Sequence, residues 1–498
     1  MNSPFDRTRR WLAEFADNPD ALARALSQIR VNLRMNQATT DNEIALAIAA
    51  TMLLRLEDAA PILQLDVATT RTRRLPRLGP GPLVEELAAE HRGFRSAERL
   101  SSAKTGEAAI TLAFGQPGSP HSVAVASSGW QVAVGRPLTG PPGNEIAAAF
   151  AGILASVEAI KTMLLAVGIQ DRTLEPWTGV ASLWDYGLPG APGPALPESL
   201  DLGGCVFLGC GGIGSAMAWA TALLNLTGSP LAIDDDHLDL TSLNRHLTAT
   251  HREALTAMPK ADAFVTLLNS AGASAQSIKV RWQDLDPDTR GSRALVAVSV
   301  DDDASRRELQ LDFPRVILNA GNSDTGLYRV TRHDFIHGAC LRCVSRSDLR
   351  AHGPEESAAR RLGLTLDDIS PYLVRNDVLP YDLLQRATID DADRDRIRGL
   401  RARQALGVVC ATFAPVPDLP ALSMPPLSAA PGVLLAGELV KARIGGHPAL
   451  NANANVVAAS IARGPHDRWV TTRSKQPRCE CNDPFYRRAY RRAWPDAG

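Results

Sequence analysis

The chain has 498 residues, of which 45% are hydrophobic and 21% charged, which is typical of a folded globular protein of about three domains. The 53 Lys and Arg residues nearly balance 54 Asp and Glu residues, for a formal net charge of -1. This balance excludes a chain-wide basic field of the kind that attracts nucleic acid or an anionic membrane. No apolar stretch follows the basic residues near the N-terminus, so the sequence predicts a cytoplasmic protein without a signal peptide or membrane span.

The first part of the chain, residues 1–70, is predicted to be a helical region. In its stretch 41–56, apolar residues recur at three- and four-residue spacing after Asp41, a candidate helix cap. Residues 71–190 form the next predicted unit, with strands expected at 108–114 and 122–134 and a long helix ending near Val167.

A pattern of four residues occurs twice in the chain at a constant offset. The two sets are Gly152, Leu154, Glu158 and Lys161, then Gly432, Leu434, Glu438 and Lys441. The pattern predicts two copies of one fold, with these helices in equivalent positions; chance similarity between two amphipathic helices is the alternative. Because no glycine loop precedes residue 150, the first copy would lack a phosphate-binding turn.

A strand, a glycine-rich turn, a helix and a second strand follow from Cys205, which is the pattern of a βαβ unit. The turn holds Gly209, Gly211, Gly212 and Gly214, and Asp234 follows the second strand. Glycines permit the tight turn, the helix N-terminus receives a phosphate, and an acidic residue in this place binds ribose hydroxyls. The pattern therefore predicts a nucleotide site, and a tight turn without a ligand is the alternative.

Cationic and acidic residues further along the chain refine this prediction. Arg245 and Lys260, with the amide of Asn244, suit a triphosphate better than a nicotinamide, because cations neutralise charge that develops during attack on the α-phosphate. A strand at 294–300 ends in Asp301, a natural Mg²⁺ ligand. An NAD-dependent oxidoreductase would need only the glycine loop and Asp234, and would leave these residues without a role.

Seven cysteines, an odd number, argue against a disulfide framework and for metal or catalytic use. Two close-spaced pairs, Cys340 with Cys343 and Cys479 with Cys481, predict a structural tetrahedral Zn²⁺ site. A redox-active C-x-x-C motif or incidental cysteines are the alternatives. Cys410 precedes a Pro-rich stretch and is either a nucleophile or a small core residue.

Residues 203–343 and 410–446 resemble the adenylating domain of ubiquitin-activating enzymes and their ThiF, MoeB and HesA relatives. The glycine loop, the acidic pair Asp234 and Asp236, and the phosphate-contacting and Mg²⁺-linked residues named above match that family's motifs. The sequence departs from these family motifs at Ser242, His246 and Asp302. The resemblance implies an α/β protein with a Rossmann-like ThiF-type adenylation domain at 191–498 that carries a helical insertion at 344–408. A degenerate adenylation-like domain and the N-terminal helical region would precede it.

Within that family, the chain is most similar to activating enzymes of bacterial ubiquitin-like conjugation operons linked to antiphage defence. The resemblance implies that the chain uses Mg-ATP to adenylate the C-terminus of a ubiquitin-like protein, captures it as a thioester on Cys410 and passes it to a conjugating enzyme. Arg30 and Arg34 are candidates for an arginine that reaches the ATP. The chain would make internally the contact that smaller relatives make by dimerising, although a homodimer is also compatible with the sequence. A sulfur-carrier adenylyltransferase for thiamine or molybdopterin synthesis and a catalytically inactive zinc-bearing binding module are the alternatives.

Overall fold

The structure of the chain is a computed structural model. It describes residues 6–496 except for 14, 68–74, 103–107, 116–121, 142, 171–173, 292, 302, 323–325, 346–358, 360–361, 376, 390, 401, 403–404, 406–423, 446–449, 451–454, 467–468 and 478. Cys410, the predicted thioester residue, lies outside the described residues.

Two β-sheets with the same strand order form the framework of the molecule. The first has the order β3-β2-β1-β4-β5-β6-β7, and the second has the order β12-β11-β9-β13-β14-β15-β16-β17. In both, the first five strands in this order are parallel, and the strands beyond them pair antiparallel. We call residues 6–182 the first unit, and 200–345 with 424–496 the second unit. The α/β fold class predicted from the sequence is confirmed.

The first unit contains seven strands, and helices precede and connect them. The strands are β1 (Arg30–Met35), β2 (Ile62–Asp66), β3 (Leu100–Ser101), β4 (Ile110–Phe114), β5 (Ser122–Ser128), β6 (Gln131–Val134) and β7 (Gly179–Ser182). The helices are α1 (Asp6–Leu12), α2 (Pro19–Leu26), α3 (Thr40–Leu54), α4 (Leu83–Glu90) and α5 (Glu145–Ala166), with short 3-10 turns at Glu57–Ala59 and Arg95–Arg99.

The second unit repeats this plan with additional elements. Its strands are β8 (Leu200–Asp201), β9 (Cys205–Leu208), β10 (Leu226–Thr227), β11 (Leu231–Ile233), β12 (Gln276–Ile278), β13 (Leu295–Val298), β14 (Val316–Asn322), β15 (Leu327–His333), β16 (Val456–Ser460) and β17 (Val470–Thr471). Its helices are α6 (Gly212–Thr221), α7 (His251–Leu255), α8 (Lys260–Ser270), α9 (Pro287–Arg290), α10 (Asp303–Leu311), α11 (Leu341–Ser345), α17 (Pro425–Ile444) and α18 (Pro484–Ala493), and 3-10 turns lie at Leu240–Ser242, Trp282–Asp284 and Glu480–Asn482.

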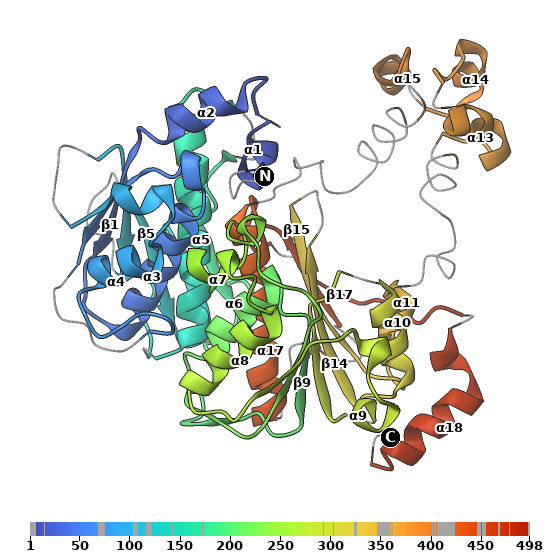
Figure 1. The fold of residues 1–498 in the computed structure, drawn as a ribbon. Helices are drawn as coiled ribbons and strands as arrows, with labels where there is room; N and C mark the ends of the chain where they lie inside the picture. Colours follow the sequence, from blue (N-terminus) through green and yellow to red (C-terminus); the bar gives the residue numbers. More distant parts are fainter. Residues whose placement is uncertain are drawn as a thin grey trace.

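Helices α5 and α17 lie side by side in the centre of the molecule, each against its own sheet (Figure 1). Each follows the sixth strand in its sheet's order, and they carry the two copies of the repeated pattern. A Cβ added at Gly152 would lie 2.3 Å from the carbonyl oxygen of Ala45 in α3, and one at Gly432 would lie 2.4 Å from that of Ile213 in α6. The repeated glycines therefore mark the same close helix contact in both units.

The repeated charged residues form two equivalent buried ion pairs. Lys161 Nζ lies 2.7 Å from Glu158 Oε1, and Lys441 Nζ lies 2.5 Å from Glu438 Oε1. All four side chains are almost inaccessible to solvent. Helix α5 is also long and apolar enough to cross a membrane, but 89% of its apolar window is buried. Its composition is that of a central core helix.

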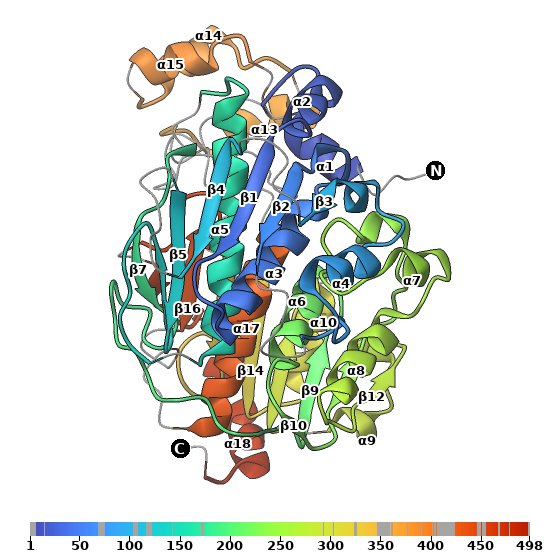
Figure 2. The same ribbon diagram turned by 90° about the vertical axis from the view of Figure 1, so that its left-hand side faces the viewer.

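The two sheets differ in how their faces are covered. In the second sheet, neighbouring residues of β9 enter opposite cores: Phe207 packs in the central core, and Val206 and Leu208 pack in a second core on the other face. In the first sheet, Val31 and Leu33 of β1 are buried, whereas Arg30 is exposed and Asn32 is partly exposed. Figure 2 shows this first sheet toward the viewer.

The prediction that residues 1–70 are helical is wrong for two segments. β1 and β2 are adjacent parallel strands of the first sheet. They are only six and five residues long, and only β1 alternates between buried and more exposed residues, so the longer helical pattern of 41–56 dominated the prediction. The helices α1, α2 and α3 of this region are present.

Part of the predicted helical insertion forms a small unit with its own core. Its helices are α13 (Leu366–Arg375), α14 (Tyr381–Arg386) and α15 (Asp391–Ile397). Buried residues from all three helices pack together, among them Ile369, Leu384 and Ile397.

Candidate functional site

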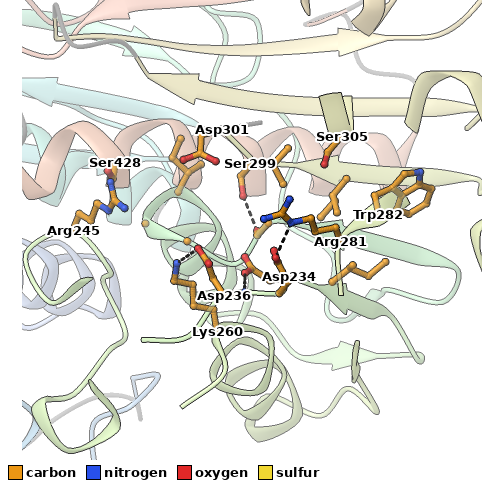
Figure 3. Close-up of a pocket in the computed structure, with 18 of the residues that line it drawn as sticks. Asp234, Asp236, Arg245, Lys260, Arg281, Trp282, Ser299, Asp301, Ser305 and Ser428 are labelled. Atoms are coloured by element: carbon orange, nitrogen blue, oxygen red, sulfur yellow. Dashed lines mark hydrogen bonds and ion pairs between the residues drawn. The ribbon is translucent and has the colours of Figure 1, made fainter. Parts of the chain in front are cut away.

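A cavity of about 420 Å³ lies at the carboxyl ends of β9, β11 and β13 in the second unit (Figure 3). The chain runs from β9 to β11 on one side of this point and continues with β13 on the other. Such a reversal of strand order leaves a crevice between loops, which is where α/β folds bind ligands. The structure brings together Gly209, Gly211 and Gly212 of the glycine turn with Asp234, Asp236, Arg245, Lys260 and Asp301, all of which line the cavity; their roles in binding and catalysis stay predictions.

The glycine turn is tight because two of its positions leave no room for a Cβ atom. Gly209 has φ of 92°, and a Cβ on it would lie 2.8 Å from the backbone nitrogen of Val300. A Cβ on Gly214 would lie 2.3 Å from the carbonyl oxygen of Gly209. Helix α6 begins after Gly211, which makes no side-chain cap hydrogen bond. Its first N–H groups therefore point toward the cavity without a capping side chain, an arrangement that suits an anion.

Asp234 shapes the glycine turn. Its Oδ2 accepts a hydrogen bond from the Cys210 amide at 2.5 Å, and its Oδ1 accepts one from the Asp236 amide at 2.9 Å. Burial raises the pKa of the Asp234 carboxyl, and these two amides act in the opposite direction. The role as a ribose ligand stays a prediction, but the carboxylate also has a structural role that the motif does not reveal.

Two cations, Lys260 and Arg245, line one side of the cavity. Lys260 Nζ lies 2.6 Å from Asp236 Oδ2, and Arg245 lines the opening close to Ser428 (Figure 3). Burial lowers the pKa of Arg7 in α1, and repulsion from Arg245 and Arg10 lowers it further.

Arg7 was not considered in the sequence analysis, where the candidates for an arginine that reaches the ATP are Arg30 and Arg34; that role stays a prediction. Both of those lie in β1; Arg30 is exposed, and Arg34 Nε lies 3.6 Å from Asp66 Oδ2 on the neighbouring strand. The spacing of arginines along the chain does not predict which of them lies near Arg245, because that depends on how α1 packs on the second unit.

Asn244, predicted to contact nucleotide, is absent from the residues that line the described cavity. It is fully buried, and its Nδ2 donates to Thr8 Oγ1 at 2.8 Å and to the Arg55 carbonyl at 3.3 Å. Asn244 therefore joins the second unit to the first, whereas the next residue, Arg245, faces the cavity.

The side of the cavity around Trp282 combines apolar residues with Arg281, whose Nε lies 2.9 Å from Asp235 Oδ2. Trp282, Val280 and Ile233 line it, and the Trp282 indole donates from Nε1 to Asp312 at 2.7 Å (Figure 3). Asp301 lies at the end of β13 with an exposed side chain that faces the cavity. Trp282, Ser299 and Ser428 were not predicted, since no motif marks them. The arrangement provides apolar side chains for a base, cations for phosphates, and a carboxylate that could hold Mg²⁺.

The four paired cysteines meet at one buried point, on segments that follow β15 and β17. Cys340 Sγ lies 3.7 Å from Cys343 Sγ and 3.5 Å from Cys479 Sγ, and Cys343 Sγ lies 3.5 Å from Cys481 Sγ. A tetrahedron with Zn–S bonds of about 2.3 Å has S–S edges of about 3.8 Å, so the donor set fits Zn²⁺. The arrangement is closed and buried, as structural zinc sites are. The predicted cysteine cluster is confirmed.

No protein-family model matches the chain. No curated protein matches it in sequence. Solved structures of E. coli MccB are similar to it. MccB alone has a TM-score of 0.34 and 15% identity, over 56% of this chain and 64% of that chain. MccB with ATP has a TM-score of 0.33 and 14% identity, over 56% and 65%. The microcin C7 biosynthetic enzyme MccB in complex with N-formylated MccA has a TM-score of 0.33 and 15% identity, over 56% and 66%. The chain thus spans just under two thirds of the MccB chain in each of these structures.

Proposed function

We propose that this chain is an ATP-dependent adenylating enzyme that activates the C-terminus of a ubiquitin-like protein. The observation that carries the proposal is the cavity in the second unit, where a glycine turn, the cations Arg245, Lys260 and Arg281, the Asp301 carboxylate and the apolar Trp282 surround one space. A dinucleotide of nicotinamide type has no third phosphate to match Arg245 and Lys260, so a nucleoside triphosphate fits the charges better.

In the proposed reaction, a carboxylate oxygen of the ubiquitin-like protein attacks the α-phosphorus of ATP. The bond between that phosphorus and the bridging oxygen breaks, so pyrophosphate leaves and an acyl-adenylate remains. The first N–H groups of α6 would hold phosphate oxygens, while Lys260 and Arg245 would neutralise the charge that moves onto the leaving pyrophosphate. Asp301 would hold Mg²⁺, which supplies further neutralisation of phosphate charge when bound.

We propose Cys410 as the acceptor for the second step. Its thiol loses a proton, the thiolate attacks the acyl carbon, and AMP leaves as the thioester forms. The product would pass to a conjugating enzyme, in the setting of bacterial antiviral defence. The first unit, which has the strand order of the second but no glycine turn, would be a degenerate copy that supports it.

Pyrophosphate exchange tests the first step. The full chain, Mg-ATP and the ubiquitin-like protein encoded beside it should exchange labelled pyrophosphate into ATP, and Asp301→Asn should lower the rate about 100-fold or more. A sulfur-carrier adenylyltransferase would also exchange. An inactive binding module or an oxidoreductase would not, and absence of exchange with measurable NAD binding would contradict the proposal.

A non-reducing gel tests the second step. The wild-type chain should form a thiol-sensitive adduct with the ubiquitin-like protein, and Cys410→Ala should form none. Cys205→Ala is the matched control, because Cys205 is buried in β9. Exchange that persists without any wild-type adduct would favour the sulfur-carrier alternative.

A further inference from the structure

A fully buried arginine of the first unit contacts the second unit next to the cavity. Arg55 caps the C-terminus of α3 and is 0% exposed. Its Nη1 donates to the Leu243 carbonyl at 2.5 Å, and its Nη2 donates to the carbonyls of Leu247 and Ala249, each at 2.9 Å. All three acceptors belong to residues 243–249, which we call the bridging segment.

The bridging segment connects Arg55 to the phosphate end of the cavity. It carries Arg245, which lines the cavity. His246 Nε2 lies 3.0 Å from the Cys210 carbonyl in the glycine turn, and the Leu247 amide donates to Ser215 Oγ in α6 at 3.0 Å. One guanidinium in the first unit is thus linked, through a single short segment, to both the glycine turn and a cation of the cavity.

The energetics favour a role in fixing backbone conformation. Burial lowers the pKa of Arg55 to about 10, so the guanidinium stays charged at neutral pH. Burying a charge is costly unless its donors are satisfied. Here Nη1 and Nη2 donate to three carbonyls and the Phe94 ring lies 5.2 Å from the guanidinium carbon, while the buried Nε has no hydrogen-bond partner among the described residues. A rigid planar fork that holds three carbonyls fixes their relative orientation, which a flexible lysine would not reproduce.

We propose that Arg55 is a positioning residue that holds Arg245 at the cavity, so that the first unit completes the nucleotide site of the second. The identity of the ligand rests on the proposed function, whereas the mechanical link does not. Arg55 touches no nucleotide; it acts through the bridging segment.

Arg77 provides a matched control within the same interface. It is also an arginine of the first unit that reaches the second, where its Nη2 lies 2.7 Å from Glu253 Oε2 in α7. Its Nε also pairs with Glu90 at 3.2 Å. Arg77 therefore joins the units as Arg55 does, but through side chains of α7 instead of carbonyls of the bridging segment.

Hydrogen exchange of the full chain without nucleotide tests the link directly. The amides of Arg245, His246 and Leu247 are hydrogen-bonded, so their exchange reports on the bridging segment. Arg55→Met should speed exchange there about tenfold or more while β14 and β15 keep their protection. Arg77→Met should leave the segment as in the wild type. Unchanged protection in Arg55→Met, or equal loosening by Arg77→Met, would overturn the proposal.

Mg-ATP binding provides the second readout. Arg55→Met should weaken binding about tenfold or more, Arg55→Lys should give an intermediate loss, and Arg77→Met should bind as the wild type does. In Arg55→Ala, millimolar guanidinium should restore part of the affinity by filling the vacated space, which a general loss of stability would not allow. If the wild type binds no ATP, the proposed function fails, and the exchange experiment alone still decides the role of Arg55. ATP affinity in Arg55→Met equal to that of the wild type would contradict the positioning role.

Discussion

The two units of this molecule share a strand order but differ at the edge where the second unit has its cavity. In the first unit, the turn after β1 is closed by its own side chains: Thr39 Oγ1 accepts from the Asn42 amide at 3.3 Å, and Asn42 Nδ2 donates to the Gln37 carbonyl at 2.9 Å. In the second unit, the corresponding turn after β9 is made of glycines, and α6 has no side-chain cap. The N-terminus of α3 is capped by a side chain of its own unit, whereas the N-terminus of α6 is available to a ligand.

The acidic residue after the second strand differs in the same way. In the first unit, Asp66 pairs with Arg34 of the neighbouring strand. In the second unit, Asp234 instead holds the backbone of the glycine turn in shape. The shared fold therefore provides the same sheet edge in both units, while a few turn residues decide whether that edge can bind a ligand.

The largest expected effect concerns the cysteine cluster, which the second unit has in addition to the repeated plan. We expect one Zn²⁺ per chain, and Cys343→Ser should lose it. Structural zinc contributes folding energy of about 10 kcal/mol in small peptides, so we expect a loss of at least about 4 kcal/mol here and a Tm lower by about 10 °C.

Elemental analysis and thermal unfolding measure the two effects on zinc. Cys205→Ala is the control and should keep the metal. Hydrogen exchange should show the loss at β15 and α18, with β1 of the first unit unaffected. Full zinc content in Cys343→Ser would show that the four thiols are not its ligands.

The cations of the second unit give the next largest effect. Lys260→Ala should weaken catalysis of pyrophosphate exchange about 100- to 1,000-fold, since it removes one charge aimed at the phosphates. Arg34→Ala, at the edge of the first unit, should leave exchange unchanged because its ion pair is half-exposed and contributes little. Exchange that falls equally in both variants would break the distinction between the two edges.

The sequence predicted the features that depend on short, local patterns. The glycine turn, the long helix that ends near Val167 and the cysteine pairs each follow from local residue patterns, and the structure contains all three. Prediction from the sequence failed where tertiary packing decides which way a side chain faces. Asn244 and Arg245 are neighbours in one motif, yet one faces the first unit and the other the cavity. Arg7 is far from that motif in sequence, and only the packing of α1 brings it near.

The paired glycines test whether the two units respond alike. Gly152→Ala and Gly432→Ala each force a Cβ against a backbone carbonyl, so each should cost about 1–3 kcal/mol of unfolding free energy. Gly432→Ala should also weaken ATP binding, because its carbonyl neighbour, Ile213, lies in the first turn of α6. Gly437→Ala is the control, since a Cβ there would lie 3.4 Å or more from its nearest neighbours. Denaturant titration with and without Mg-ATP separates the two effects, and equal ATP affinity in all three variants would contradict the second expectation.

The smallest expected effect is a pH dependence that one histidine of the first unit causes. Burial, and then the nearby charge of Arg55, lower the pKa of His91 to about 3. In the unfolded chain its pKa is about 6.5. Between these values the unfolded state binds the extra proton, so stability falls as pH falls below about 6.5, by about 1.4 kcal/mol per pH unit.

His91→Gln should remove this contribution while leaving that of His246, whose pKa burial and Arg55 also lower to about 3 in the second unit. Glu57, whose pKa burial raises to about 7, acts with the opposite sign, but it is present in both proteins and cancels in the difference. Urea unfolding at pH 5 and pH 7 should therefore show that the free energy of unfolding falls between pH 7 and pH 5 by about 2 kcal/mol less in His91→Gln than in the wild type. If the two proteins lose the same amount, His91 is not held neutral beside Arg55.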